Sequence, residues 1–304
     1  MKKLLLIINP KSGKLLVQAA LFSIIEVFCR ADFLVTTRFT FAPGDAEKIA
    51  FEAGQKGEYD LIVCSGGDGT LNGVLSGIVK SGKKKPVGFI PAGSTNDFAN
   101  SMKMPTEPIL AAESIVNTES PVCLDIGKFN GERYFSYIAS FGAFTATSYT
   151  VPQDMKNALG HFAYVLGGIK DVTAIKPYHI EAFSDDRNFE GDYIFGAVCN
   201  SFSVGGVIKF TASDINLNDG LFEVLFVKQP KNASQLNKML WGFINTDFSD
   251  SEVFEFFKTS KIALKMPEGV NWTLDGEFEK GETSIVIENI KSAIEIMYTA
   301  EGKK

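Results

Sequence analysis

The stretch Ser65-Gly66-Gly67-Asp68-Gly69-Thr70-Leu71-Asn72 decides the fold, because it connects two segments of different periodicity. The segment before it, residues 59–64, is short, apolar and β-branched, which predicts a buried strand. After it, apolar residues recur at the spacing of one helix face: Leu71, Val74, Leu75 and Ile78. A glycine turn between a strand and a helix start presents unpaired backbone N–H groups to an anion. The stretch therefore predicts a phosphate-binding turn.

Asp68 is the unexpected member of this turn. A carboxylate about 5 Å from a phosphate oxygen is repelled by roughly 3 kcal/mol at an effective dielectric constant near 20. Asp68 therefore needs a partner, either a cation such as Mg²⁺ or the proton of a substrate hydroxyl. Taken alone, Gly-Gly-Asp-Gly fits a glycine-rich hairpin with an exposed aspartate equally well.

Two further turns of the same kind follow predicted strands. Residues 3–8 form an apolar run that ends in Asn9-Pro10-Lys11-Ser12-Gly13, and residues 86–90 form another that ends in a turn at residues 91–98. The carboxyl ends of parallel strands meet at one edge of a sheet, so the three turns are expected to converge there. The first part of the chain is therefore predicted to be an α/β nucleotide-binding domain with a parallel sheet.

The pattern changes near residue 120. Two strand-like runs surround the hairpin signal Asn130-Gly131. Further short strands are predicted at residues 178–183, 193–200, 220–227, 261–266 and 284–290, and helices at residues 154–174, 234–248 and 252–258. This predicts a C-terminal β-sandwich over residues 121–290, after an α/β domain over residues 1–120. The final apolar run, residues 293–299, is expected to be a strand, and residues 291–304 are a candidate to return to the first domain.

Two polar loops of the second half are candidate sites. Residues 214–220 offer several oxygen ligands for Mg²⁺ or Ca²⁺, although a plain hairpin turn explains the same residues. The segment Trp272-Thr273-Leu274-Asp275-Gly276-Glu277-Phe278 pairs two carboxylates around a glycine, and a type I′ turn at Asp275-Gly276 is the alternative explanation. The sequence leaves open which of the two carboxylates faces a site.

Composition excludes some classes of function. The chain has 304 residues and a formal net charge of −6, with a pI near 5.2, which argues against a nucleic-acid binder. No uninterrupted apolar run approaches the length that spans a bilayer, so membrane contact is expected to be peripheral and the location cytoplasmic.

Six motifs occur together in one order, and this order resembles the diacylglycerol kinase catalytic-domain family, specifically the soluble bacterial lipid kinases. The motifs are Asn9 to Gly13, Thr40 with Gly44-Asp45-Ala46, Gly66 to Asn72, Pro91 to Phe98, Asp219-Gly220, and Leu274 to Glu277. The resemblance implies ATP-dependent transfer of a phosphate to a lipid hydroxyl, most readily that of diacylglycerol, in a cleft between the two domains.

The resemblance also implies roles for single residues. Glu277 would be the general base, with Asp68 and Asp97 in a Mg²⁺ and water network and Asp275 beside it. A structural Mg²⁺ would be held by the Asp219 side chain and the carbonyls of Asn216 and Leu221. ATP would contact Asn9, Pro10, Lys11, Ser12, Gly13, Thr40, Gly66, Gly67, Asp68, Gly69, Thr70, Leu71, Asn72, Gly73 and Ser94. The chain departs from the family at Ser94, where threonine is usual, and at Asn72-Gly73, where Asn-Glu is commoner.

Two other functions remain open at this point. One is an NAD kinase-like phosphotransferase, since Gly-Gly-Asp-Gly is shared with NAD kinases. The other is a nucleotide- or lipid-binding regulator without turnover. The expected partners are a lipid alcohol and the membrane surface, with no nucleic acid, and a homodimer is left open.

Overall fold

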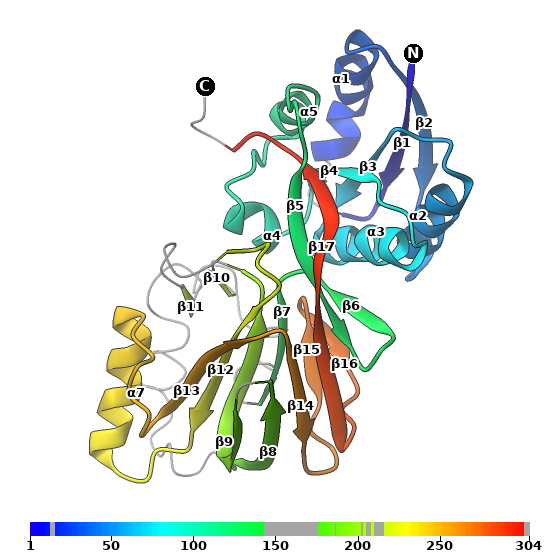
Figure 1. Ribbon diagram of the computed structural model, residues 1–304. Helices are drawn as coiled ribbons and strands as arrows, with labels where there is room; N and C mark the ends of the chain where they lie inside the picture. The colour runs from blue at the N-terminus through cyan, green and yellow to red at the C-terminus, as the bar shows by residue number, and fades with distance from the viewer. Residues whose placement is uncertain are drawn as a thin grey trace. The chain divides into compact units, whose positions relative to one another are not determined.

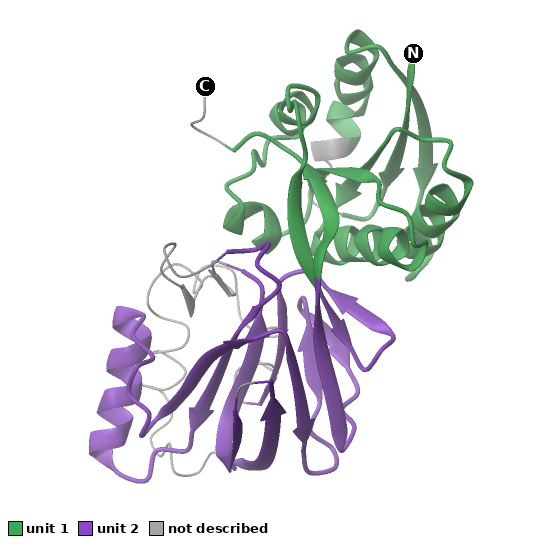
Figure 2. Cartoon of the chain, in the orientation of Figure 1, with its two compact units in different colours: residues 1–126, 291–304 green, residues 127–290 purple. Residues whose placement is uncertain are grey.

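A computed structural model describes residues 1–12, 16–142, 176–185, 187–201, 203–204, 208–209 and 216–300 (Figure 1). The chain divides into two compact units, which are shown in different colours in Figure 2. Unit 1 comprises Met1–Ile126 and Lys291–Lys304, and unit 2 comprises Gly127–Ile290. The chain passes from one unit to the other within strand β5 (Val122–Phe129) and returns within strand β17 (Ser284–Met297).

The sheet of unit 1 is parallel. Its strands are β1 (Lys2–Ile8), β2 (Phe33–Phe39), β3 (Leu61–Gly66) and β4 (Pro86–Pro91), in the order β4-β3-β1-β2. Leu4 of β1 pairs with Val35 of β2 on one side and with Leu61 of β3 on the other. The last residues of β17 extend the sheet beside β4, with Ile296 opposite Val87. These strands confirm the predicted parallel sheet.

Helices connect the strands and cover both faces of this sheet (Figure 1). They are α1 (Leu16–Arg30), α2 (Asp45–Lys56), α3 (Asp68–Lys80), α4 (Asp97–Ser101) and α5 (Pro108–Val116). On one face, Ile24 and Phe28 of α1 and Ile115 of α5 share a buried cluster with Leu4 and Val63 of the sheet. Each crossover places a helix start at the carboxyl end of a strand, where the predicted phosphate-binding turns lie.

Unit 2 is rich in antiparallel strands. Besides its parts of β5 and β17 it contains β6 (Arg133–Phe135), β7 (Ile138–Gly142), β8 (Tyr178–Ser184), β9 (Asn188–Cys199), β10 (Ser203–Val204), β11 (Ile208–Lys209), β12 (Phe222–Lys228), β13 (Phe254–Thr259), β14 (Lys261–Lys265), β15 (Trp272–Leu274) and β16 (Glu277–Glu279), with helix α7 (Ala233–Asn245). The strand order β16-β15-β7-β9-β8-β14-β17 is antiparallel throughout. This confirms the predicted β-rich C-terminal domain.

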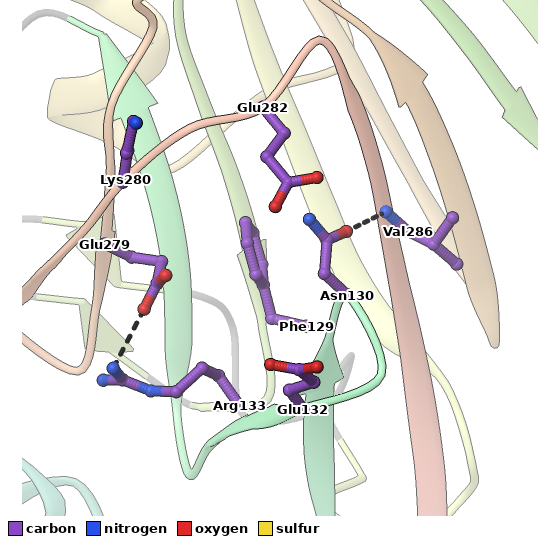
Figure 3. A pocket seen from close by; sticks show the side chains of 8 residues that line it. All are labelled: Phe129, Asn130, Glu132, Arg133, Glu279, Lys280, Glu282 and Val286. Atoms are coloured by element: carbon purple, nitrogen blue, oxygen red, sulfur yellow. Dashed lines mark hydrogen bonds and ion pairs between the residues drawn. The ribbon is translucent and has the colours of Figure 1, made fainter.

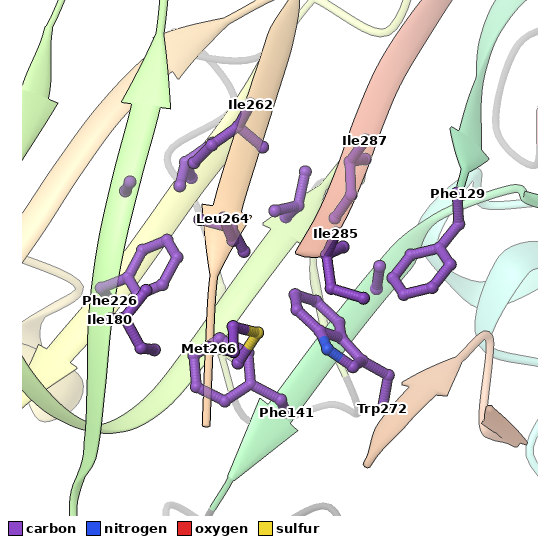
Figure 4. Packing of buried hydrophobic residues seen from close by; sticks show 14 of the residues in the cluster. Phe129, Phe141, Ile180, Phe226, Ile262, Leu264, Met266, Trp272, Ile285 and Ile287 are labelled. Atoms are coloured by element: carbon purple, nitrogen blue, oxygen red, sulfur yellow. The ribbon is translucent and has the colours of Figure 1, made fainter. Parts of the chain in front are cut away.

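Aromatic residues fill the core of unit 2 (Figure 4). The ring centroids of Phe141 and Trp272 are 4.9 Å apart, and those of Phe141 and Phe226 are 5.6 Å apart. All three side chains are buried. Burial of apolar area at roughly 25 cal/mol per Å² makes such rings, with the aliphatic side chains around them, a large source of stability for this unit.

Two predicted elements differ from the structure. The helix expected at residues 252–258 is wrong, because this segment contains strand β13, paired antiparallel with β12. Phe256 contacts Phe248 while Phe257 packs against the main core, so both faces of β13 are covered by apolar side chains and the alternation typical of a strand is hidden. The two strands expected at residues 284–290 and 293–299 are one strand, β17.

The helix predicted at residues 154–174 lies outside the described residues. No helix in the described part of the chain is long and apolar enough to cross a membrane.

Helices α2 and α3 approach each other closely where α3 carries a glycine, so replacing this glycine is expected to lower the stability of the chain. A Cβ at Gly77 of α3 would collide with the backbone oxygen of Glu47 and lie 2.8 Å from the nitrogen of Phe51, both in α2. Glycine to alanine inside a helix normally stabilises by about 1 kcal/mol, but here overpacking should destabilise the chain by about 1–3 kcal/mol. We expect Gly77→Ala to lower the denaturation midpoint.

Gly73→Ala is the matched comparison, because its Cβ would first meet the Ala46 side chain, at 3.1 Å. It should cost less than Gly77→Ala. Equal or higher stability of Gly77→Ala would contradict the close contact of the two helices.

Candidate functional site

Hydrogen bonds tie together the carboxyl ends of all four strands in unit 1. The Thr40 N–H, just after β2, donates to the Ile8 carbonyl of β1 at 2.9 Å. The Asn9 N–H, just after β1, donates to the Ser65 carbonyl of β3 at 2.9 Å, and the Ala92 N–H, just after β4, donates to the Gly66 carbonyl at 2.7 Å. The three turns predicted to converge therefore lie side by side along this edge of the sheet.

Two of the turns touch through glycine. A Cβ at Gly93 would lie 2.8 Å from the Cα of Gly67, and a Cβ at Gly67 would lie 3.3 Å from the Cα of Gly93. The φ of Gly67 is −88°, which any residue can adopt. Glycine at these positions is thus explained by the close approach of two loops, in addition to the approach of an anion that the sequence predicts.

The Asn9 side chain fixes the first turn against the second. Its Nδ2 donates to the Thr70 Oγ1 at 3.1 Å, and its Oδ1 accepts from the Lys11 N–H at 3.0 Å. Thr70 lies in the first turn of α3, so the loop after β1 is attached directly to the start of that helix. Gly13, which was predicted to contact ATP, lies outside the described residues.

Asp68 is the first residue of α3, and its carboxylate binds the start of α4. Its Oδ2 accepts from the Asp97 N–H at 3.0 Å and its Oδ1 from the Phe98 N–H at 3.2 Å. Burial raises the pKa of Asp68, and these two N–H donors act in the opposite direction. These two N–H groups thus supply part of the compensation that the Asp68 carboxylate is expected to need. Asp68 contacts Asp97 through the Asp97 backbone N–H.

The other predicted nucleotide residues lie along the same edge. Thr40 is buried, and Ser94 is exposed in the loop after β4. That loop is folded by Asn96, whose Oδ1 accepts from the Gly93 N–H at 2.7 Å and whose φ is +50°. The loop therefore has a defined conformation, held by its own side chain.

In unit 2, Asp275 is enclosed by donors from another segment. Its carboxylate accepts three backbone N–H groups, those of Ser136 at 2.6 Å and of Tyr137 and Ile138 at 3.0 Å, and the Ser136 hydroxyl at 2.8 Å. Asp275 is only 4% exposed, and burial raises its pKa to about 6 despite the four bonds. The bonds attach the β15–β16 hairpin to the β6–β7 connection. No local motif indicates this partner, because Ser136 lies 139 residues away in the chain.

The backbone of this hairpin is a type I′ turn. Asp275 and Gly276 have φ values of +49° and +85°, and Leu274 pairs with Glu277. The turn explanation of this segment is therefore confirmed, while a role for its carboxylates in a site stays a prediction.

Glu277 differs from Asp275 in being accessible. Its side chain is 53% exposed, and the Arg133 guanidinium lies 3.7 Å from its Oε2. Arg133 also contacts the Glu279 carboxylate at 3.0 Å. Arg133 and Glu279 line a cavity of about 430 Å³ in unit 2, together with Phe129, Asn130, Glu132, Lys280, Glu282 and Val286 (Figure 3). Arg133 is thus a neighbour of Glu277, the predicted base. No sequence motif indicated that Arg133 would lie there.

The predicted metal residues lie in the turn before β12. The Asp219 Oδ1 accepts from the Leu221 N–H at 2.9 Å, and the Asp219 N–H donates to the Asn216 carbonyl at 3.4 Å. Lys258 lies 3.8 Å from the other Asp219 oxygen and 3.1 Å from buried Glu223, whose pKa burial raises to about 7. No cluster of three or more histidine, cysteine or acidic side chains suited to a metal occurs among the residues that the structure describes.

Comparisons with known proteins give one consistent result. Residues 3–128 match the diacylglycerol kinase catalytic domain, and residues 139–298 match the YegS C-terminal NAD kinase beta sandwich-like domain. The diacylglycerol kinase of Bacillus subtilis is 34% identical over 280 residues, covering 91% of this chain and 90% of the relative. That of Staphylococcus saprophyticus is 29% identical over 295 residues, covering 97% of this chain and 95% of the relative.

Solved structures agree with the sequence relatives. A provisionally named diacylglycerol kinase from Bacillus anthracis (strain Sterne) superimposes with a TM-score of 0.81 at 25% identity, covering 98% of this chain and 97% of that one. Matches of this extent, in both units and over nearly the whole chain, show that the protein belongs to the diacylglycerol kinase catalytic-domain family.

Proposed function

We propose that this chain is an ATP-dependent lipid kinase that transfers the γ-phosphate to a lipid hydroxyl, converting diacylglycerol to phosphatidic acid. The observation that carries the proposal is the carboxyl edge of unit 1, where three turns are hydrogen-bonded together around the start of α3. Relatives named diacylglycerol kinase, matched over most of the chain, supply the substrate class.

The nucleotide is proposed to bind along this edge. A helix start presents backbone N–H groups that suit phosphate oxygens, as do the small residues of the turns. At the start of α3 the Thr70 N–H already donates to the Gly67 carbonyl, at 3.0 Å, so the phosphates are assigned to the N–H groups before it. We assign the nucleotide contacts to Asn9, Pro10, Lys11, Ser12, Gly13, Thr40, Gly66, Gly67, Gly69, Thr70, Leu71, Asn72, Gly73 and Ser94. A bound Mg²⁺ would neutralise part of the polyphosphate charge, and Asp68 and Asp97 are the proposed residues of its ligand and water network.

Glu277 is the proposed general base. A lipid hydroxyl is a weak nucleophile, so its proton must be taken up as its oxygen bonds to the γ-phosphorus. In the same step the bond from the γ-phosphorus to the bridging oxygen breaks and ADP leaves, while the proton passes to the Glu277 carboxylate. The exposure of Glu277 supports this role, because the carboxylate is accessible to a substrate.

Asp275 is proposed to position the base and not to react. Its oxygens already accept four hydrogen bonds, and its side chain is almost wholly buried. Because Glu277 is two residues further on in the same hairpin, fixing Asp275 fixes the backbone from which Glu277 projects.

Peripheral membrane contact and a cytoplasmic location belong to the same proposal, since diacylglycerol resides in the bilayer while ATP is dissolved. A structural Mg²⁺ is proposed at the Asp219 side chain and the carbonyls of Asn216 and Leu221. A homodimer is compatible with this function but is not required by it.

The activity is tested with the purified chain, labelled ATP and Mg²⁺, and a panel of diacylglycerol, a sphingoid base, phosphatidylglycerol and NAD. We expect label in diacylglycerol, recovered as phosphatidic acid. Label in NAD alone would instead support an NAD kinase-like reaction, and label in none of the four would refute the kinase.

Glu277→Gln tests the base. It should lower kcat by about 10²–10⁴-fold, the usual contribution of a general base, while the affinity for ATP stays nearly unchanged. Glu268→Gln is the control, since Glu268 is an exposed carboxylate elsewhere in unit 2. Loss of nucleotide binding in Glu277→Gln would show that Glu277 has a different role.

Asp275→Asn tests the positioning residue, because the amide loses at least one of the four bonds. We expect the free energy of unfolding to fall by about 1–3 kcal/mol at pH 7, with a lower kcat. Folded Asp275 has a pKa of about 6, above its unfolded value near 3.9. Its protonation therefore stabilises the fold fully below about pH 4, and this contribution is lost as the pH rises to about 6.

The deficit of Asp275→Asn relative to wild type should consequently be larger at pH 5 than at pH 7, as measured by denaturant unfolding. Asp32→Asn, at an exposed turn, is the control. A constant deficit for Asp275→Asn would contradict the assigned pKa direction.

The structural ion is tested by thermal unfolding with Mg²⁺ or with a chelator. Asp219→Ala should lose the stabilisation that Mg²⁺ gives to wild type. Asp247→Ala is the matched control, because the Asp247 Oδ1 accepts the same kind of turn bond, from the Ser249 N–H at 3.0 Å. If Mg²⁺ raised the melting temperature of Asp219→Ala as much as that of wild type, the ion would have to bind elsewhere.

A further inference from the structure

The carboxyl end of β2 carries two exposed aromatic side chains, Phe39 at 41% and Phe41 at 77%, and Phe41 is the more exposed. Phe41 follows buried Thr40 directly after β2, and its side chain is 77% exposed. A large apolar ring is costly to leave in water, by roughly 25 cal/mol per Å² of area that could be buried. The ring is therefore available to a flat apolar ligand face.

The backbone that carries this ring is fixed. The Phe41 and Ala42 N–H groups both donate to the Asp45 Oδ2, at 2.8 and 2.9 Å. The Asp45 N–H donates back to the Ala42 carbonyl at 3.2 Å, and the Thr40 N–H is bonded to Ile8 of β1. Phe41 thus projects from a turn whose position relative to the sheet is set by hydrogen bonds on both sides.

Strand spacing puts Phe41 at a suitable distance from the start of α3. The order β3-β1-β2 places β2 two strands from β3, which is about 10 Å at the usual spacing of about 4.8 Å. A nucleotide whose phosphates lie at the start of α3 and whose ribose crosses the end of β1 would bring its base to the end of β2.

The opposite direction offers no such ring in the described residues of the loop after β4. Phe98, in the helix that follows that strand, is buried and packs edge-on against Phe89, with ring centroids 6.3 Å apart. The arrangement therefore favours the β2 side for an aromatic base.

We propose that Phe41 forms the nucleobase subsite, with its ring stacked on the purine of the bound nucleotide. This inference rests on the proposed use of ATP and adds the direction in which the nucleotide lies and a residue that contacts its base. The phosphates would be bound by the turns around α3, and the base by Phe41. The contributions of the phosphates and of the base to the binding affinity can therefore be measured separately.

The experiment compares two ligands by calorimetry on the full chain, in the presence of Mg²⁺. ADP carries the base, and pyrophosphate carries only the phosphates. Phe41→Ala should weaken ADP binding by about 5- to 150-fold, the range that corresponds to the usual contribution of a stacked base, and should leave pyrophosphate binding unchanged. Phe41→Trp should retain the affinity for ADP.

Phe22→Ala is the matched control, because Phe22 is 81% exposed in α1, away from the strand ends. It should leave both affinities unchanged. Equal ADP affinity in wild type and Phe41→Ala would overturn the subsite, as would an equal loss for ADP and pyrophosphate, which would indicate a structural effect. Loss of binding to diacylglycerol vesicles with unchanged ADP affinity would assign Phe41 to the membrane and also overturn it.

The outcomes separate this inference from the proposed function. If wild type binds ADP and Phe41 has no effect, only the subsite fails. If wild type binds neither ADP nor pyrophosphate, both the use of ATP and the subsite are overturned.

Discussion

The contact between the backbones of Gly67 and Gly93 is the constraint on which the candidate site in unit 1 depends. It lets the loops after β3 and β4 lie against each other, and this contact accompanies the bonds from Ala92 to Gly66 and from Asp97 to Asp68. A Cβ at Gly93 would lie 2.8 Å from the Gly67 Cα, so a side chain there would force the two loops apart, whereas a Cβ at Gly67 would make a tight contact at 3.3 Å. The hydrogen bonds to the Asp68 carboxylate therefore depend on the close packing of the two loop backbones.

Three aspartates have the same structural role: each carboxylate accepts hydrogen bonds from neighbouring backbone N–H groups. Asp45 binds those of Phe41 and Ala42, Asp68 those of Asp97 and Phe98, and Asp275 those of Ser136 to Ile138. In each case a single charged side chain fixes the conformation of a segment that would otherwise leave polar groups unpaired. For Asp68 and Asp275 the fixed segment is distant in the sequence, so the carboxylate also joins two parts of its unit.

The sequence predicted the periodic parts of this protein well and the long-range contacts poorly. Strand-turn-helix order was readable because buried parallel strands are short apolar runs and helices follow a 3.6-residue spacing. β13 was mistaken for a helix because its faces are both covered, by Phe248 and by the main core. The donors to Asp275 could not be predicted, because nothing in the local sequence around Ser136 or Asp275 refers to the other segment. The same holds for Arg133, which becomes a neighbour of Glu277 only through strand pairing.

These three aspartates accept similar hydrogen bonds, and burial decides whether the pKa of each is raised or lowered. N–H donors lower the pKa of Asp45, which is exposed, whereas burial outweighs the same kind of donor at Asp68 and Asp275 and raises theirs. The stability that Asp45 contributes is therefore present above its unfolded pKa and is lost on acidification, while that linked to protonation of the two buried groups is lost as the pH rises. With a pKa of about 6, Asp275 is ionised at neutral pH, and its four donors then face a full charge. At neutral pH the hairpin that carries Glu277, the proposed base, is thus attached to the β6–β7 connection through an ionised Asp275, whose four donors offset part of the cost of burying that charge.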